Sequence, residues 1–191
     1  MQSNYSFHPI AGFDRNVAVG LICYFCDRSS SLAKRKLTKL KLIKLIYLTE
    51  REFIERNGFP ILLDEYFSLK DGPICSATLN IINDAQNPSS GLPFELIGDA
   101  IQLRHGVLLE EWLDALSEAD IDAAERVWEK HGLKTASELR NYTHKYCPEY
   151  THVTSGRSPI HLESLLSATG VRDAKGVASD IESLRRISSQ F

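Results

Sequence analysis

The sequence lacks the excess of basic residues that proteins usually need to bind nucleic acid nonspecifically. Its 191 residues include 22 lysines and arginines against 25 aspartates and glutamates, which gives a formal net charge of −3. The isoelectric point from the sequence is about 6.1. Any contact with nucleic acid must therefore be made by one local patch rather than by the surface as a whole.

Long hydrophobic runs are also missing. The one apolar run near the N-terminus, VAVGLICYFC, spans ten residues, follows Asp14 and Arg15, and lacks a small-residue cleavage site. A helix that crosses a bilayer needs about 20 apolar residues, and a signal peptide needs a cleavage site. We therefore expect no membrane span and no secretory start, and we expect the protein to be cytoplasmic.

Cysteine is scarce and irregularly spaced, at Cys23, Cys26, Cys75 and Cys147. This pattern does not indicate a disulfide framework and suggests reduced thiols. Cys23 and Cys26 form a CxxC, which could be half of a zinc site or a redox pair. However, no second CxxC exists and no strand is predicted before it. We interpret both cysteines as small apolar side chains in the middle of a helix.

Motifs for catalysis are absent from the sequence as well. It contains no GxSxG, P-loop, Rossmann fingerprint or HExxH. The segment after residue 142 offers four further candidate metal ligands: His144, Cys147, His152 and His161. Two of them lie in or beyond a Gly/Ser loop, so we expect no metal, no cofactor and no enzyme activity. We expect His144 to be hydrogen-bonded within the helix packing instead.

What the sequence does have is a lysine-rich segment, KRKLTKLKLIKLIYLTEREF, over residues 34–53. On a helical wheel its large apolar side chains cover more than half of the circumference. The remaining narrow sector holds Lys41, Lys44, Arg51, Glu52 and Glu55. The pattern predicts a mostly buried helix with one water-exposed stripe. Lys39 and Glu50 interrupt the apolar arc, which argues against a helix that lies on a membrane.

The first part of this segment, residues 34–44, forms what we call the basic fringe. Its lysines crowd the N-terminal half of the predicted helix, where the helix dipole disfavours positive charge. Runs of charge usually mark solvated surface. Two interpretations stay open: a solvated fringe, and a basic patch that contacts an acidic partner or RNA.

The next segment, NGFPILLDEYFSLKDGPICSATLNIIND, predicts a helix end at Asn57-Gly58 and a short strand over residues 65–69. Asp71-Gly72-Pro73 then predicts a turn, with Pro73 at the first position of another helix. Such a turn presents nearby side chains on a stiff ledge. Further on, AIQLRHGVLLEEW predicts a hairpin around His105-Gly106 that could pair with the strand at residue 65.

Later helices carry signals at their ends. Two capping boxes are predicted, Ser117 with Asp120 and Thr135 with Glu138. In SPIHLESLLSATG we expect Ser158 as the cap, Pro159 in the first turn and Gly170 as the stop. A polar helical segment over residues 173–187 follows.

These elements predict a mainly α fold with a small β-sheet, an α+β architecture. We expect one helix-dominated domain with about six or seven helices and a short three-stranded β-flap. The domain should cover residues 1–170, and a C-terminal polar helical segment should cover residues 171–191.

Two segments, KLIKLIYLTEREFIERNGFPILLDEYFSLKDGPI and LSEADIDAAERVWEKHGLKTASELRNYTH, carry a family resemblance through their order and spacing. They resemble the Panacea domain, the SocA-like antitoxin domain of bacteria and phages, over roughly residues 15–170. The family's KLxKLLYxA helix corresponds to residues 41–48, with Thr49 at the usual small position. Its closing LxxxTH pattern is kept as Leu139, Thr143 and His144.

The family's KYGPV turn is matched less completely. The matching residues are Lys70, Gly72, Pro73 and Ile74, after the aromatic Phe67. Two residues depart from the pattern: Leu69 stands nearest a position that is often tryptophan, and Asp71 replaces the usual tyrosine. Both departures lie in the turn that we consider the best candidate for function.

The resemblance implies an antitoxin that binds and silences a toxin protein, usually encoded by a neighbouring gene, without acting on it chemically. Members of the family pair with toxins of many classes, so the identity of the toxin does not transfer. The alternatives are a nucleic-acid-binding regulator that uses the basic fringe, a phage accessory protein and a proteolytic adaptor. We do not expect the isolated protein to bind nucleic acid, and a homo-oligomer stays open. The candidate partner-binding residues are Phe67, Lys70, Asp71, Gly72, Pro73 and His144.

Overall fold

The computed structural model describes residues 12–31 and 36–188. The helices in this part are α1 (Arg15–Ser30), α2 (Lys39–Asn57), α3 (Ser76–Asp84), α4 (Leu109–Leu113), α5 (Glu118–His131), α6 (Ala136–Tyr146), α7 (Leu162–Ala168) and α8 (Ala174–Ser188). The strands are β1 (Tyr66–Leu69), β2 (Gly72–Cys75), β3 (Phe94–Ile97), β4 (Ala100–Leu103) and β5 (Ser158–Ile160). The predicted helix-dominated α+β fold is confirmed. The described residues form eight helices, rather than six or seven.

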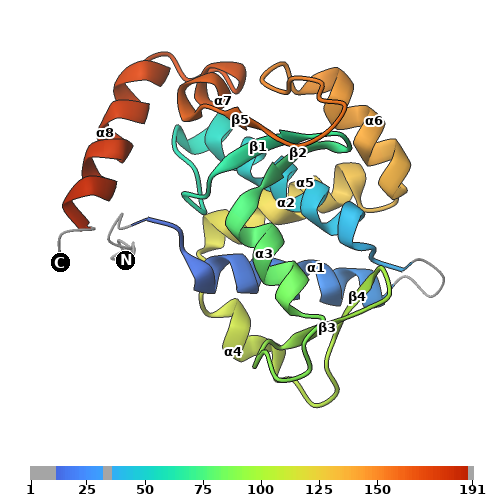
Figure 1. The fold of residues 1–191 in the computed structure, drawn as a ribbon. Coiled ribbons are helices and arrows are strands. Elements are labelled where there is room, and N and C mark those ends of the chain that lie inside the picture. Colours follow the sequence, from blue (N-terminus) through green and yellow to red (C-terminus); the bar gives the residue numbers. More distant parts are fainter. Residues whose placement is uncertain (1–11, 32–35, 189–191) are drawn as a thin grey trace.

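Helix α2 lies in the middle of the molecule (Figure 1). The three-stranded sheet and α6 lie on one side of it, and α1, α4 and the β3–β4 hairpin lie on the other. Helix α2 contacts α1, α3, α5, α6, α7 and β2. Its apolar side chains Leu42, Leu45 and Ile46 are fully buried. The core therefore forms around this one helix.

The three-stranded sheet has the order β2-β1-β5, and both pairings are antiparallel. The sequence predicted that the segment from residue 100 would supply the third strand of this sheet, and this prediction is wrong. Residues 100–103 pair instead with β3 in a separate two-stranded hairpin, whose turn contains Gly98 with φ +64°. A two-residue turn with a left-handed glycine favours pairing between its own flanking strands. The predicted hairpin around His105-Gly106 is therefore wrong as well.

Two prolines that the sequence placed at helix starts lie in strands instead. Pro73 belongs to β2, and α3 begins three residues later at Ser76. Pro159 belongs to β5, where it lies opposite Phe67. Both strands are edges of the sheet. Proline is tolerated at an edge because one side of an edge strand has no neighbouring strand that needs a backbone N–H donor. His161, rather than Ser158, takes the N-cap position of α7.

The predicted water-exposed stripe of α2 is confirmed at Glu55, which is exposed, and is wrong at Lys41 and Lys44. Lys41 and Lys44 are 3% and 0% exposed, and Glu50 is 0% exposed. Each finds a backbone partner: Lys41 Nζ donates to the Gly132 carbonyl at 2.6 Å. The carboxylate of Glu50 accepts backbone N–H bonds from residues 61 and 62, at 3.0 and 2.6 Å. Buried polar groups are tolerated where such partners replace water.

The predicted ends of several helices are confirmed. Both capping boxes form, at the start of α5 and at the start of α6. Gly58 ends α2 with φ +81°, the left-handed conformation that glycine adopts without strain. The last segment is helical, as α8.

Helix α1 buries the two cysteines of the CxxC, as predicted. Both thiols are free, and burial raises the pKa of Cys23 to about 12. A thiol with so high a pKa is protonated and unreactive at neutral pH. None of the helices in residues 12–31 and 36–188 combines the length and the apolar character needed to cross a membrane.

Candidate functional site

The turn between β1 and β2 presents Lys70 and Asp71 to solvent. We call residues 67–73 the ledge. Gly72 has φ +103°, and a Cβ built on it would lie 2.8 Å from Thr143 Oγ1 and 3.0 Å from Lys44 Nζ. The turn therefore requires glycine at position 72 for two reasons: its backbone angle and its close packing against α2 and α6.

Lys44 supports the ledge from inside the protein. Its Nζ donates a hydrogen bond to the Pro73 carbonyl at 2.8 Å. Burial lowers the pKa of Lys44 to about 7, although the charge of Asp71 opposes the change. Sequence reasoning missed this residue because a helical wheel assigns lysine to water. The only signal was that Lys44 lies between apolar neighbours on both sides.

Helix α6 holds the ledge from the other side. Arg140 Nε lies 2.9 Å from Asp71 Oδ1 in an ion pair. The His144 ring stacks on Tyr150, with ring centroids 4.5 Å apart and an angle of 19° between the planes. The Tyr150 hydroxyl donates to the Leu69 carbonyl at 3.1 Å. The structure thus brings His144 next to the turn residues, to which the sequence could not connect it.

His144 itself differs from what the sequence predicts. We expected a hydrogen bond, but within the described residues its Nε2 has no hydrogen-bond partner. Stacking on Tyr150 holds the ring instead. Burial, and then the nearby charge of Arg140, lower the pKa of His144. The neutral imidazole is therefore favoured next to the ledge.

Phe67 is half-buried on β1, at the start of the ledge. The guanidinium carbon of Arg157 lies over its ring, 4.3 Å from the centroid. Arginine on an aromatic face is a favourable cation–π contact. Of the predicted ledge residues, Lys70 and Asp71 are exposed, Phe67 is half-buried beneath Arg157, and Gly72 and Pro73 are buried.

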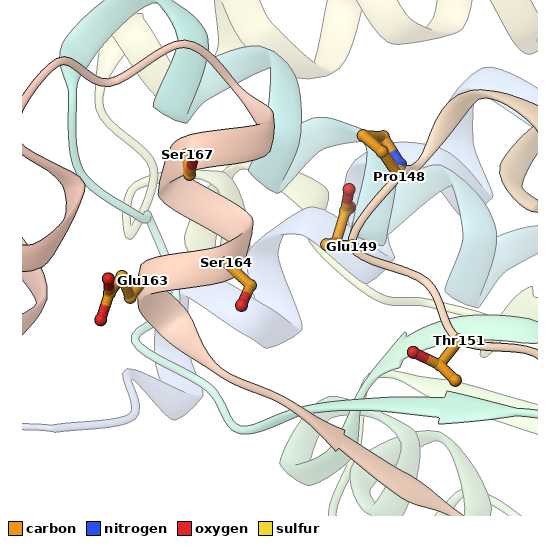
Figure 2. Close-up of a pocket in the computed structure, with 6 residues that line it drawn as sticks. All are labelled: Pro148, Glu149, Thr151, Glu163, Ser164 and Ser167. Carbon is orange, nitrogen blue, oxygen red and sulfur yellow. The ribbon is translucent and has the colours of Figure 1, made fainter.

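An open pocket of about 480 Å³ lies beside the segment that connects α6 to β5 (Figure 2). Residues from that segment line one side of it, and α7 lines the other. The lining residues are Pro148, Glu149, Thr151, Glu163, Ser164 and Ser167. Sequence reasoning missed the pocket, because no sequence pattern brings α7 next to this segment.

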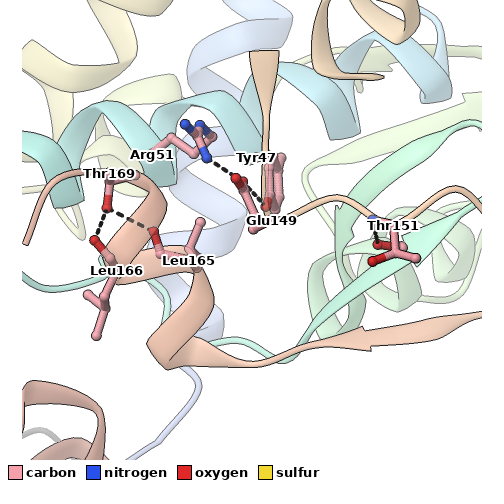
Figure 3. Close-up of polar contacts among 8 residues, drawn as sticks. Tyr47, Arg51, Glu149, Thr151, Leu165, Leu166 and Thr169 are labelled. Atoms are coloured by element: carbon pink, nitrogen blue, oxygen red, sulfur yellow. Dashed lines mark hydrogen bonds and ion pairs between the residues drawn. The ribbon is translucent and has the colours of Figure 1, made fainter. Parts of the chain in front are cut away.

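The connecting segment is tied to α2 and to the sheet (Figure 3). Glu149 Oε1 accepts a hydrogen bond from the Tyr47 hydroxyl at 2.6 Å and forms an ion pair with Arg51. The backbone N–H of Thr151 donates to Ser68 Oγ at 3.0 Å. Through these contacts the same short segment lines the pocket and fixes the ledge.

The basic fringe is smaller than its sequence suggests. Lys34 and Arg35 lie outside the described residues. Lys41 and Lys44 are buried, and Lys39 Nζ bonds to Asn83 Oδ1 at 3.1 Å. Within residues 12–31 and 36–188, no group of three or more His, Cys, Asp or Glu side chains is placed to hold a metal ion.

Comparison with known families gives a match to a family model. A family model described as antitoxin SocA-like, Panacea domain, matches residues 42–149. No curated protein and no solved structure matches the chain. The matched residues make up more than half of the chain, and they begin in α2 and end at Glu149, so they include the whole ledge and α6. The chain belongs to the family of antitoxin SocA-like proteins that carry a Panacea domain.

Proposed function

We propose that this chain is the antitoxin of a toxin–antitoxin pair and neutralises a protein toxin by binding it directly. One observation carries the proposal: the segment that matches the antitoxin family contains the ledge and the α6 side chains that hold it. The toxin is expected to be the product of a neighbouring gene. We propose the ledge as part of the toxin-binding surface.

The ledge has the properties of a preorganised binding surface. Lys44 and Tyr150 donate hydrogen bonds to its backbone, and Thr143 packs against Gly72. Lys70 and Asp71 remain exposed at its tip. A surface that is already rigid loses little conformational entropy when a partner docks, so more of the contact energy remains as affinity.

Binding without catalysis fits the state of the reactive groups near the ledge. Lys44 Nζ is occupied by the Pro73 carbonyl. Cys147 is buried, and burial raises the pKa of its thiol to about 12. The thiol is protonated, and neither it nor the fully buried amine of Lys44 is accessible to a substrate. We therefore assign the ledge to recognition.

A nucleic-acid-binding regulator has weaker support. It depended on the basic fringe, and two of the lysines of that fringe, Lys41 and Lys44, are buried and bonded to backbone carbonyls. A buried lysine cannot neutralise a phosphate on the surface. No described contact favours this function, and we do not propose it.

Coexpression tests the proposed function. The wild-type chain is expressed with each neighbouring gene in turn, and we expect it to restore growth against one toxic product. Lys70→Ala and Asp71→Ala should weaken this protection, because they remove exposed side chains from the ledge. Both variants should stay folded, with a free energy of unfolding within about 1 kcal/mol of the wild type, because the side chains are exposed.

The matched control is Ile46→Ala, which removes a fully buried side chain from α2. It should lower the free energy of unfolding by roughly 2–5 kcal/mol. The protection that remains with Ile46→Ala shows how far a loss of stability alone weakens protection. If the wild type protects cells and both folded ledge variants protect them equally well, the toxin binds elsewhere. If the wild type protects against no neighbouring product, the antitoxin function itself is wrong.

A further inference from the structure

The turn end of the three-stranded sheet carries two cations without a counter-charge. Lys70 lies in the turn between β1 and β2, Arg157 lies immediately before β5, and both residues are exposed. The register of β5 on β1 pairs Ser158 with Ser68, so Arg157 lies one position further along, next to the turn. Among the described residues, neither cation forms an ion pair.

Arg157 is placed by its contact with Phe67. Its guanidinium carbon lies over the ring, 4.3 Å from the centroid. A guanidinium that contacts a ring through its face keeps the N–H donors in its own plane available to an acceptor. The contact also restricts the long arginine side chain before a partner arrives, so less conformational entropy is lost on binding. Phe67 therefore acts as a platform for a residue that the sequence did not single out.

The acidic side chains of the ledge and of the segment after α6 are already paired. Asp71, in the ledge, forms an ion pair with Arg140 at 2.9 Å. Glu149, in the segment after α6, is buried and forms an ion pair with Arg51. The two exposed cations are therefore uncompensated, although the whole chain has a formal net charge of −3. This local excess of positive charge favours an anionic partner.

We propose that Lys70 and Arg157 bind carboxylates on an acidic segment of the protein partner. The planar fork of arginine matches a carboxylate with two parallel hydrogen bonds, and lysine adds a point charge beside it. Nucleic acid fits less well, because its binding usually depends on about 6–10 phosphate contacts. That the partner is a toxin rests on the proposed antitoxin function; the preference for an acidic segment rests on the charges and on the Phe67 contact.

The direct test uses the full chain and two peptides, acetyl-Ala-Glu-Glu-Ala-amide and acetyl-Ala-Gln-Gln-Ala-amide. They have nearly the same shape, but only the first carries carboxylates. We expect the glutamate peptide to cause saturable shifts of the Arg157 side-chain Nε–H and Lys70 amide resonances, and the glutamine peptide to bind at least about fivefold more weakly. Equal binding of both peptides, or no shift of these two resonances with the glutamate peptide, overturns the proposal.

Three variants separate the charge of Arg157 from its shape. Arg157→Gln should weaken binding of the glutamate peptide by about two- to fivefold, because it removes an exposed charge. Arg157→Lys keeps the charge but not the fork, so its affinity should lie between those of the wild type and Arg157→Gln. Wild-type affinity of Arg157→Lys would overturn the two-bond contact.

The matched control is Arg172→Gln, which removes another exposed arginine from the connection between α7 and α8. Helix α8 lies on the opposite side of the molecule from α6 (Figure 1). The control should bind the glutamate peptide as tightly as the wild type does. Equal loss in Arg157→Gln and Arg172→Gln, or loss in neither, overturns the role of Arg157.

Single-stranded RNA is the competing anionic partner. The wild type and both glutamine variants are titrated with a labelled RNA of about 20 nucleotides at two salt concentrations. We expect no RNA binding that Arg157→Gln weakens more than Arg172→Gln does. RNA binding that is lost in Arg157→Gln alone would assign the two cations to phosphates and overturn the acidic protein segment.

Coexpression separates this proposal from the antitoxin function. If the wild type protects cells from a toxin, a folded Lys70→Glu/Arg157→Glu variant should lose most of the protection, because like charges would then face each other. Arg172→Glu should keep the protection. Full protection by the double variant overturns the acidic contact and leaves the antitoxin function intact. A wild type that protects against no neighbouring product overturns the antitoxin function, whereas the preference for the glutamate peptide still stands.

Discussion

A single lysine in the core links stability to pH. Burial lowers the pKa of Lys44 to about 7, from the ordinary value of 10.5 that it regains on unfolding. Between these two pH values the unfolded chain binds more protons than the folded one. The stability of the fold therefore rises as the pH increases from about 7 to 10.5, and the cost of burying the charge is fully present below about pH 7.

The effect can be measured by urea unfolding of the wild type and of Lys44→Met at about pH 7 and about pH 9.5. The wild type should gain more stability over this range than the variant does. Glu50, whose pKa burial raises to about 8, acts in the opposite direction, because its stabilising protonated form is lost as the pH rises through that value. It is present in both proteins, so it cancels in the difference. Equal gains would show that Lys44 is charged throughout.

Buried charges are also where prediction from sequence fails at the scale of the residue. Lys41 and Lys44 follow the polar positions of a helical wheel, and the wheel predicts that such positions face water. Their acceptors are carbonyls of Gly132 and Pro73, which lie far away in the sequence. No pattern in the sequence near either lysine indicates these partners. The acceptors become known only when the chain is folded.

At the scale of the element, the ends of helices are predictable because their chemistry is local. The capping boxes at Ser117 and Thr135 and the stop at Gly58 each depend on residues within one turn. Strand β5 is the opposite case: its three residues gain their conformation by pairing with β1, and Pro159 within them indicates a helix start when it is considered alone. The ledge was found from sequence, whereas the contacts that fix it were not.

Helix α6 should transmit a change at its cap to the ledge. Thr135→Ala removes the hydroxyl that accepts the Glu138 N–H at 3.2 Å. We expect it to lower the free energy of unfolding by about 1 kcal/mol. Because α6 carries Arg140 and His144, we also expect faster hydrogen exchange in the ledge. Thr135→Ser, which keeps the hydroxyl, is the control; identical exchange in both variants would show that the cap does not support the ledge.

At the scale of the whole molecule, the division of the chain into a domain over residues 1–170 and a C-terminal segment over residues 171–191 stays a prediction. Helix α8 adds a modest apolar contact, made by Ala174, Ala178 and Ile181. Its Arg185 also bonds to the Leu63 carbonyl. A chain that ends at Gly170 should therefore still unfold in one cooperative step, at a lower midpoint temperature than the full chain. Calorimetry on both chains checks this, and loss of the cooperative transition would make α8 part of the domain.

The order of the strands also sets when the ledge can be completed during synthesis. Strands β1 and β2 are adjacent in the sequence, so their hairpin can form early. Thr151, which bonds to Ser68, is made 83 residues after it. At about 5–20 residues per second, the ribosome needs roughly 4–17 s to reach it. During that interval the turn lacks its contacts with α6 and with the segment after α6, so a nascent chain completes the proposed binding surface only after Thr151 has been made.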